Sequence, residues 1–126
     1  MRIILDERVT DWLQGKLQPQ DRLYLDFEDG IGPFANTEIS CRLDLSFRLI
    51  ITGKNYPEKG LEVYNIPVET SVGVFHIKES SLPYFEEENF LTFSPQMALR
   101  LKGASGILAD NIPLLRMSQE QAGAKE

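Results

Sequence analysis

The residues of this chain that could do chemistry gather around one Gly/Pro-rich stretch. Asp26, Glu28 and Asp29 precede that stretch, and Cys41, the only cysteine, follows it. A thiolate binds soft metals and iron–sulfur clusters, whereas carboxylates bind hard cations through roughly six to eight oxygens. Asp26 and Glu28 would share one face of a strand, where they are candidate metal ligands. Acidic side chains in such a place are also typical of a solvated sheet surface.

Cys41 has two possible environments. An iron–sulfur cluster is usually held by about four ligands, so one thiol needs help from a second chain or from non-cysteine groups. If the strand that contains Cys41 runs unbroken to Ile51, the sulfur lies on the apolar face of that strand and is buried. A bulge between Cys41 and Leu43 would turn it outward.

A catalytic interpretation of the chain would depend on His76, the only histidine. A nucleophile needs a base and a group that orients the base. His76 lies in a strand-like run with Val72 and Val74 on its own face, which favours a structural histidine. The chain also has no Ser-centred elbow, Gly-rich phosphate loop or His-Glu-x-x-His motif. We therefore expect a protein that is not an enzyme.

Two alternating runs must position the acidic residues and the cysteine. Leu23 to Phe27 alternates apolar and polar residues, and Leu43 to Ile51 does the same with Arg48 and its polar neighbours on the second face. Asp29-Gly30 and Gly32-Pro33 lie between the two runs and require a turn there. The sequence predicts two long strands joined at this corner.

The rest of the chain predicts one helix and several more strands. Asp6 is the expected N-cap of a helix whose apolar residues, Trp12 among them, pack on a sheet. Short apolar runs separated by Gly and Pro indicate strands, and residues 53 to 60 indicate an exposed loop. We expect a mainly β (α+β) domain with an antiparallel or mixed sheet and one N-terminal amphipathic helix, over residues 1–116, and a flexible tail over 117–126. The expected strands are Met1 to Leu5, Leu61 to Ile66, Ser71 to Lys78, Phe90 to Phe93 and Met97 to Leu101. A short helical turn or irregular cover begins at Ser80 to Phe85, and Ile107 to Leu115 is a last apolar segment.

Composition excludes several classes of function. The chain has 126 residues, a net charge of −6 and a pI near 4.8. An acidic surface disfavours nucleic acid and anionic membranes as partners. The start of the chain turns acidic after five residues, unlike a signal peptide, and no stretch has the length of a membrane span. The expected location is the cytoplasm.

These features together resemble the HesB/IscA-like iron–sulfur cluster biosynthesis domain, in the divergent branch of low-GC Gram-positive bacteria. The resemblance is carried by the N-terminal strand and helix, by the strand Leu23 to Phe27, and by the glycine-containing corner that leads to Cys41. The segment Leu82 to Phe85 and the strand Phe90 to Phe93 before Ser94-Pro95 also match. It covers roughly residues 1 to 116 and implies a HesB-like fold.

The resemblance also implies where metal ligands should be. Carrier members of this family hold iron or a cluster between subunits with three cysteines, the last two as a Cys-x-Cys pair near the C-terminus. Cys41 stands at the first position, but residues 102–111, where the pair is expected, contain no thiol. The implied site is then a thiolate–carboxylate one, formed by Cys41 with Asp110 or with Asp26 and Glu28.

Two functions follow from this comparison. The first is a non-enzymatic, carrier-like accessory with a degenerate site that handles iron or a cluster, as a homodimer or with iron–sulfur assembly proteins. The second is an interaction or regulatory module that kept the scaffold and lost metal binding. Its partner surface would then lie at Phe34 or at Tyr84 and Phe85.

Overall fold

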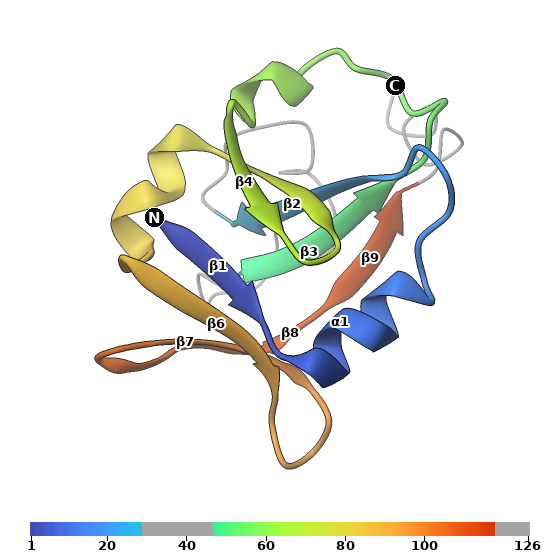
Figure 1. Cartoon of the computed structure of the whole chain (residues 1–126). Coiled ribbons are helices and arrows are strands. Elements are labelled where there is room, and N and C mark those ends of the chain that lie inside the picture. Colours follow the sequence, from blue (N-terminus) through green and yellow to red (C-terminus); the bar gives the residue numbers. More distant parts are fainter. Residues whose placement is uncertain (29–46, 118–126) are drawn as a thin grey trace.

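The computed structural model describes residues 1–28 and 47–117, and it arranges them in two mixed β-sheets with one α-helix (Figure 1). One sheet has four strands in the order β1-β6-β7-β8, and the other has five in the order β4-β5-β2-β3-β9. Strands β1 and β6, β2 and β5, and β3 and β9 pair in parallel, and the other neighbours are antiparallel. The predicted mainly β fold with an N-terminal helix is confirmed. The elements are β1 (Arg2–Leu5), α1 (Glu7–Gln14), β2 (Arg22–Phe27), β3 (Phe47–Thr52), η2 (Leu61–Val63), β4 (Ile66–Thr70), β5 (Gly73–Ile77), η3 (Glu79–Tyr84), β6 (Glu88–Phe93), β7 (Leu99–Gly103), β8 (Gly106–Ile112) and β9 (Leu114–Met117).

The helix α1 begins and packs as its sequence predicts. The Asp6 side chain accepts a hydrogen bond from the backbone N–H of Val9 at 2.8 Å, which satisfies one of the free amides of the first turn. Val9 and Leu13 are buried, and the Trp12 ring meets Phe93 edge-on at 5.5 Å between centroids. The helix therefore closes one side of the space between the sheets. No helix in residues 1–28 or 47–117 is long and apolar enough to cross a membrane.

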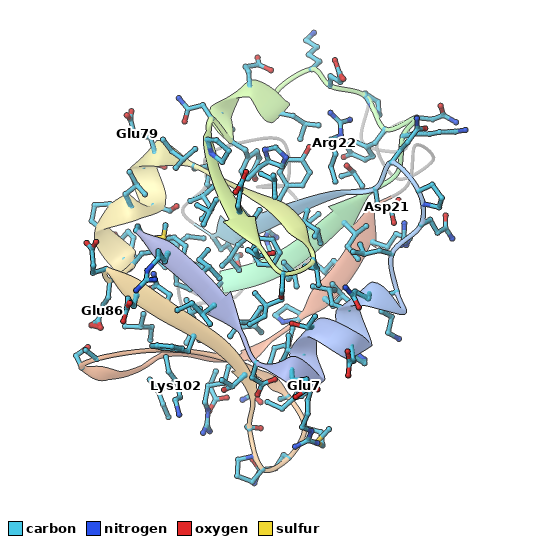
Figure 2. The ribbon with its side chains drawn as sticks, in the orientation of Figure 1. Glu7, Asp21, Arg22, Glu79, Glu86 and Lys102 are labelled. Carbon is cyan, nitrogen blue, oxygen red and sulfur yellow. The ribbon has the colours of Figure 1, made fainter. Side chains whose placement is uncertain are left out.

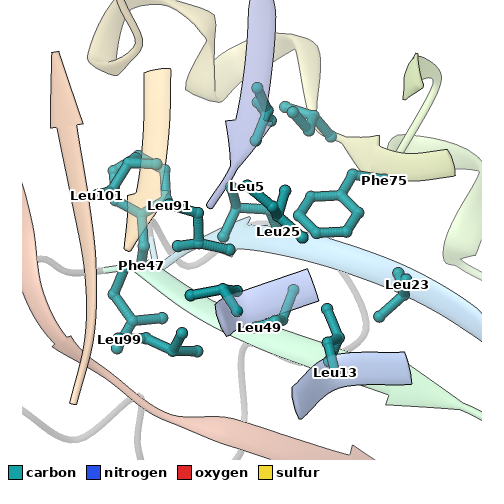
Figure 3. Close-up of a cluster of buried hydrophobic side chains, with 14 of the residues drawn as sticks. Leu5, Leu13, Leu23, Leu25, Phe47, Leu49, Phe75, Leu91, Leu99 and Leu101 are labelled. Carbon is teal, nitrogen blue, oxygen red and sulfur yellow. The ribbon is translucent and has the colours of Figure 1, made fainter. Parts of the chain in front are cut away.

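The main hydrophobic core lies between the two sheets and α1 (Figure 3). Alternate residues of β2 and β3 point into it, because successive side chains of a strand leave on opposite faces. Leu25, Leu49 and Phe75 come from the five-stranded sheet, and Leu91 and Leu101 come from the four-stranded one, all of them fully buried.

The second face of the five-stranded sheet is also covered. The segment from residue 53 to 65 folds over it, so that Leu61 and Tyr64 form a smaller buried cluster with Tyr24, Ile50 and Met117. The predicted strand Leu61 to Ile66 is wrong, because residues 61–63 form a 3-10 turn and the next strand begins only at Ile66. The turn follows Gly60, whose φ of 89° is a left-handed conformation that favours glycine.

Candidate functional site

Asp26 and Glu28, the predicted site residues of the corner that the structure describes, lie at the end of β2 that precedes residues 29–46. Phe27 of β2 is paired with Phe47 of β3 at this end, and Asp26 is paired with Arg48 one step further in. Cys41 and Phe34 lie outside the described residues. The geometry of the site is therefore built from the strand ends themselves.

Asp26 is the centre of a buried charge cluster that consists of Asp26, Arg48, Lys78 and Tyr64. Its Oδ2 accepts a hydrogen bond from Arg48 Nε at 2.8 Å, and its Oδ1 accepts one from the Tyr64 hydroxyl at 2.8 Å. Lys78 Nζ lies 3.1 Å from the same Oδ1. The Asp26 and Arg48 side chains are 1% exposed and that of Lys78 is 2% exposed. Both oxygens of this candidate metal ligand are thus engaged by protein donors.

Lys78 joins the charge cluster to the strand end. Its Nζ also donates a hydrogen bond to the backbone carbonyl oxygen of Phe27 at 2.9 Å. That carbonyl belongs to the peptide between Phe27 and Glu28, so Lys78 fixes the direction in which the chain enters Glu28. Arg48 and Lys78 thus both form an ion pair with the Asp26 carboxylate.

Glu28 is buried without a hydrogen bond. The residue is 5% exposed, and neither carboxylate oxygen has a hydrogen-bond partner in the described part of the chain. Buried carboxylates in native proteins are nearly always paired, hydrogen-bonded or bound to a metal, because removing the charge from water costs several kcal/mol. Of the predicted ligands that the structure describes, Glu28 is the one whose carboxylate oxygens have no hydrogen-bond partner within residues 1–28 and 47–117.

The donor set fits a metal ion or cluster only in part. Among the described residues, no three His, Cys, Asp or Glu side chains gather as a metal site would require. One carboxylate can ligate iron, but a cluster takes about four ligands. The described residues alone therefore do not complete a site for iron or a cluster at Glu28.

Four aromatic rings close the strand end and form what we call the aromatic rim: Phe27, Phe47, Tyr84 and Phe85. The Tyr84 ring stacks on Phe27 with 4.0 Å between centroids, and Phe85 meets Phe47 edge-on at 4.9 Å. Tyr84 remains 47% exposed. The predicted partner residues Tyr84 and Phe85 thus lie beside the ends of β2 and β3, next to the candidate ligands Asp26 and Glu28.

Asp110 belongs to the other sheet. It lies on β8 and receives two hydrogen bonds from the guanidinium of Arg100, the shorter one at 2.9 Å. The hydrogen bond from Arg100 is the main cause of the lowered pKa of the Asp110 carboxyl. Its oxygens are therefore engaged as those of Asp26 are.

His76 lines a surface pocket of about 350 Å³ between the five-stranded sheet and the covering segment. Its ring lies over Tyr24 at 5.4 Å between centroids. Partial burial, and to a lesser extent the charge of Arg22, lower the pKa of His76 below its ordinary value. Glu58 and Glu62 also line the pocket, which shows no arrangement of nucleophile and base.

Sequence reasoning missed Arg48, Lys78 and Tyr64 as parts of the site. Alternation placed Arg48 on the polar face of β3, but it did not indicate that this face is buried. Lys78 and Tyr64 carried no local signal, because their role depends on the pairing of β2 with β5 and on the covering segment.

The fold is that of an iron–sulphur cluster biosynthesis domain. A family model for iron–sulphur cluster biosynthesis matches residues 1–116, and the chain belongs to this family. No curated protein matches the sequence.

Two solved structures share the fold. One is a protein from Lactobacillus salivarius provisionally assigned to Fe-S biosynthesis, with 24% identity and a TM-score of 0.81 over 94% of this chain and 99% of that one. The other, with the same provisional assignment, is from Lactobacillus acidophilus, with 15% identity and a TM-score of 0.69 over 99% of this chain and 96% of that one.

Proposed function

We propose that this protein is a non-enzymatic accessory of iron–sulfur cluster assembly that handles iron or a cluster together with a second protein molecule. Membership of the family supports the general role. The observation that carries the specific role is the buried Glu28 carboxylate, which has no hydrogen-bond partner in the described part of the chain and stands where β2 leads into the segment with Cys41.

The chemistry of this proposal assigns a task to each residue. The thiolate of Cys41 and the carboxylate of Glu28 supply two donors, and the partner supplies the rest. Lys78 holds the peptide that precedes Glu28, so that the carboxylate is kept near the strand end. A cargo held by two donors is bound weakly, which suits a protein that passes the cargo on rather than stores it.

Anaerobic reconstitution tests the proposal. The full chain is incubated with iron and sulfide, and absorption spectra and bound iron are compared for the wild type, Cys41→Ser and Glu28→Gln. We expect a chromophore that is lost in Cys41→Ser and weakened in Glu28→Gln. Asp110→Asn is the matched control and should behave as wild type, because its carboxylate already pairs with Arg100. A wild type without a cysteine-dependent chromophore would refute the proposal.

One observation favours the interaction module as a second candidate. Tyr84 is exposed although its ring stacks on Phe27, an arrangement typical of aromatic contact residues. If the protein is such a module, a binding partner should be lost with Tyr84→Ala and kept with Cys41→Ser. If it handles cargo jointly with the partner, Cys41→Ser should weaken that complex.

A further inference from the structure

The four-stranded sheet has an outer face that no described residue covers. Its inner face carries Ile3, Leu91 and Leu101, which are buried in the main core. The opposite face carries one row of residues that are paired in register across all four strands, which we call the outer row: Ile4 of β1, Phe90 of β6, Lys102 of β7 and Ile107 of β8. In Figure 2, Lys102 points away from the body of the molecule.

Three of the four residues of the outer row are apolar and exposed. Ile4 and Phe90 are each 37% exposed, and Ile107 is 54% exposed. Ion pairs flank the row on both sides, Arg2 with Glu88 and Arg100 with Asp110. An apolar centre within a polar rim is the usual layout of a protein–protein interface.

The order of residues in the outer row points to a second copy of the same chain as the occupant. If a two-fold axis runs parallel to the strands, the outer row of one copy faces the outer row of the second copy with the order of residues reversed. Ile4 then contacts Ile107 of the second copy, and Phe90 contacts Lys102 of the second copy. The first contact buries aliphatic surface, and the second is a cation–π interaction worth about 0.5–2 kcal/mol.

The alternative two-fold arrangement is unfavourable. An axis along the row would place every residue against its own copy, so that Lys102 would meet Lys102. Two buried like charges repel each other, and this arrangement also leaves both ammonium groups without a partner. Charge complementarity therefore selects the reversed arrangement.

We infer that this protein forms a weak two-fold dimer through the outer row, with Ile4 packed on Ile107 and Phe90 on Lys102 of the second copy. Four strands about 4.8 Å apart and about 3.3 Å per residue give a face of roughly 19 by 17 Å. This is smaller than the approximately 800 Å² per partner of a stable interface, so dimerisation should depend on concentration. The inference does not depend on iron or on Cys41.

A charge swap across the interface tests both the dimer and its orientation. Sedimentation velocity is run on the full chain from low micromolar to millimolar concentration, for the wild type, Ile4→Lys, Ile107→Glu and the double variant. The wild type should move from the 14.3 kDa mass of the chain toward twice that mass. Each single variant should stay at the chain mass, because it buries an unpaired charge. The double variant should dimerise again, because each introduced lysine meets the introduced glutamate of the other copy.

Intramolecular pairing cannot produce that rescue. Three strand spacings place positions 4 and 107 roughly 14 Å apart within one chain, with Phe90 and Lys102 between them. Val74→Glu is the matched control, since Val74 is also 37% exposed but lies on β5 of the other sheet, and this variant should dimerise as wild type does. Circular dichroism confirms that each variant is folded. A wild type that keeps the chain mass throughout, single variants that still dimerise, or a double variant as monomeric as the single ones, would each overturn the inference.

Discussion

At the scale of single residues, Asp26 acts as a counter-ion within the protein. It lies opposite Arg48 in the β2–β3 pairing and also contacts Lys78, and all three side chains are almost fully buried. A buried ion pair adds little stability by itself, because desolvation offsets the attraction between the charges. Removing one partner is costly, since the remaining charge stays buried without compensation.

The Asp26→Asn variant should therefore be strongly destabilised. It leaves Arg48 and Lys78 buried without their shared anion, and we expect the free energy of unfolding to fall by about 3–5 kcal/mol. Urea unfolding followed by circular dichroism measures this change. Asp110→Asn, which breaks the exposed pair with Arg100, is the control and should have little effect. Equal stability of the two variants would contradict the burial of the cluster.

The sequence could predict which residues share a face, but not what lies over that face. Alternation correctly placed the apolar residues of β2 and β3 in the core. Alternation also placed Arg48 on the polar face of β3, yet Arg48 and Thr52 on that face are fully buried. The difference arises because Tyr64 and its neighbours fold back over this face from a separate segment, and such a long-range contact leaves no periodic pattern.

At the scale of elements, the segment from residue 53 to 65 acts as a cover for the five-stranded sheet. Leu61 is 7% exposed and packs in the second cluster with Tyr24 and Ile50, while Tyr64 meets Tyr24 edge-on at 5.0 Å between centroids. This segment therefore connects the hydrophobic cluster to the charge cluster around Asp26.

Leu61→Ala tests whether this segment contributes to stability. The substitution leaves a cavity in the second cluster and should lower the free energy of unfolding by about 2–4 kcal/mol. Chemical unfolding measures the loss. Lys59→Ala, an exposed position two residues earlier, is the control and should leave the stability nearly unchanged. If Leu61→Ala is as mild as the control, the segment is only a surface loop.

Local sequence signals predicted the elements unevenly. The capping carboxylate of Asp6 and the helical spacing of Val9 and Leu13 identified α1, because capping and amphipathic packing are local effects. Leu61 and Val63 also alternate, but residues 61–63 form a 3-10 turn after Gly60. A period of two residues over such a short run fits both a strand and a tight turn that docks on a sheet.

At the scale of the whole molecule, polar contacts join segments that are distant in the sequence. Asp21 accepts a hydrogen bond from Arg116 at 2.9 Å, which connects the start of β2 to the last strand. Burial opposes the ionised form of Asp21, but the hydrogen bonds from Arg116 and from the Gln18 amide outweigh it and lower its pKa. Hydrogen bonds from Ser105 lower the pKa of Glu86 in the same way. The family resemblance could predict the fold as a whole. It could not predict the contacts of Asp21 with Arg116 and of Glu86 with Ser105, because they depend on the side chains of this particular chain.

The lowered pKa values of His76, Asp21 and Glu86 predict that the protein loses stability in acid in two stages. The pKa of His76 is lowered from 6.5, so the unfolded chain takes up that proton first and stability should begin to fall below about pH 6.5. The pKa values of Asp21 and Glu86 are lowered from 3.8 and 4.5, so a second loss should follow below about pH 4.5. Urea unfolding at a series of pH values measures both stages, and His76→Gln should remove only the first.

The single histidine also gives a direct NMR titration, whose midpoint should lie below 6.5 and rise in Arg22→Gln. A midpoint above 6.5 would contradict both the partial burial of the ring and the influence of Arg22.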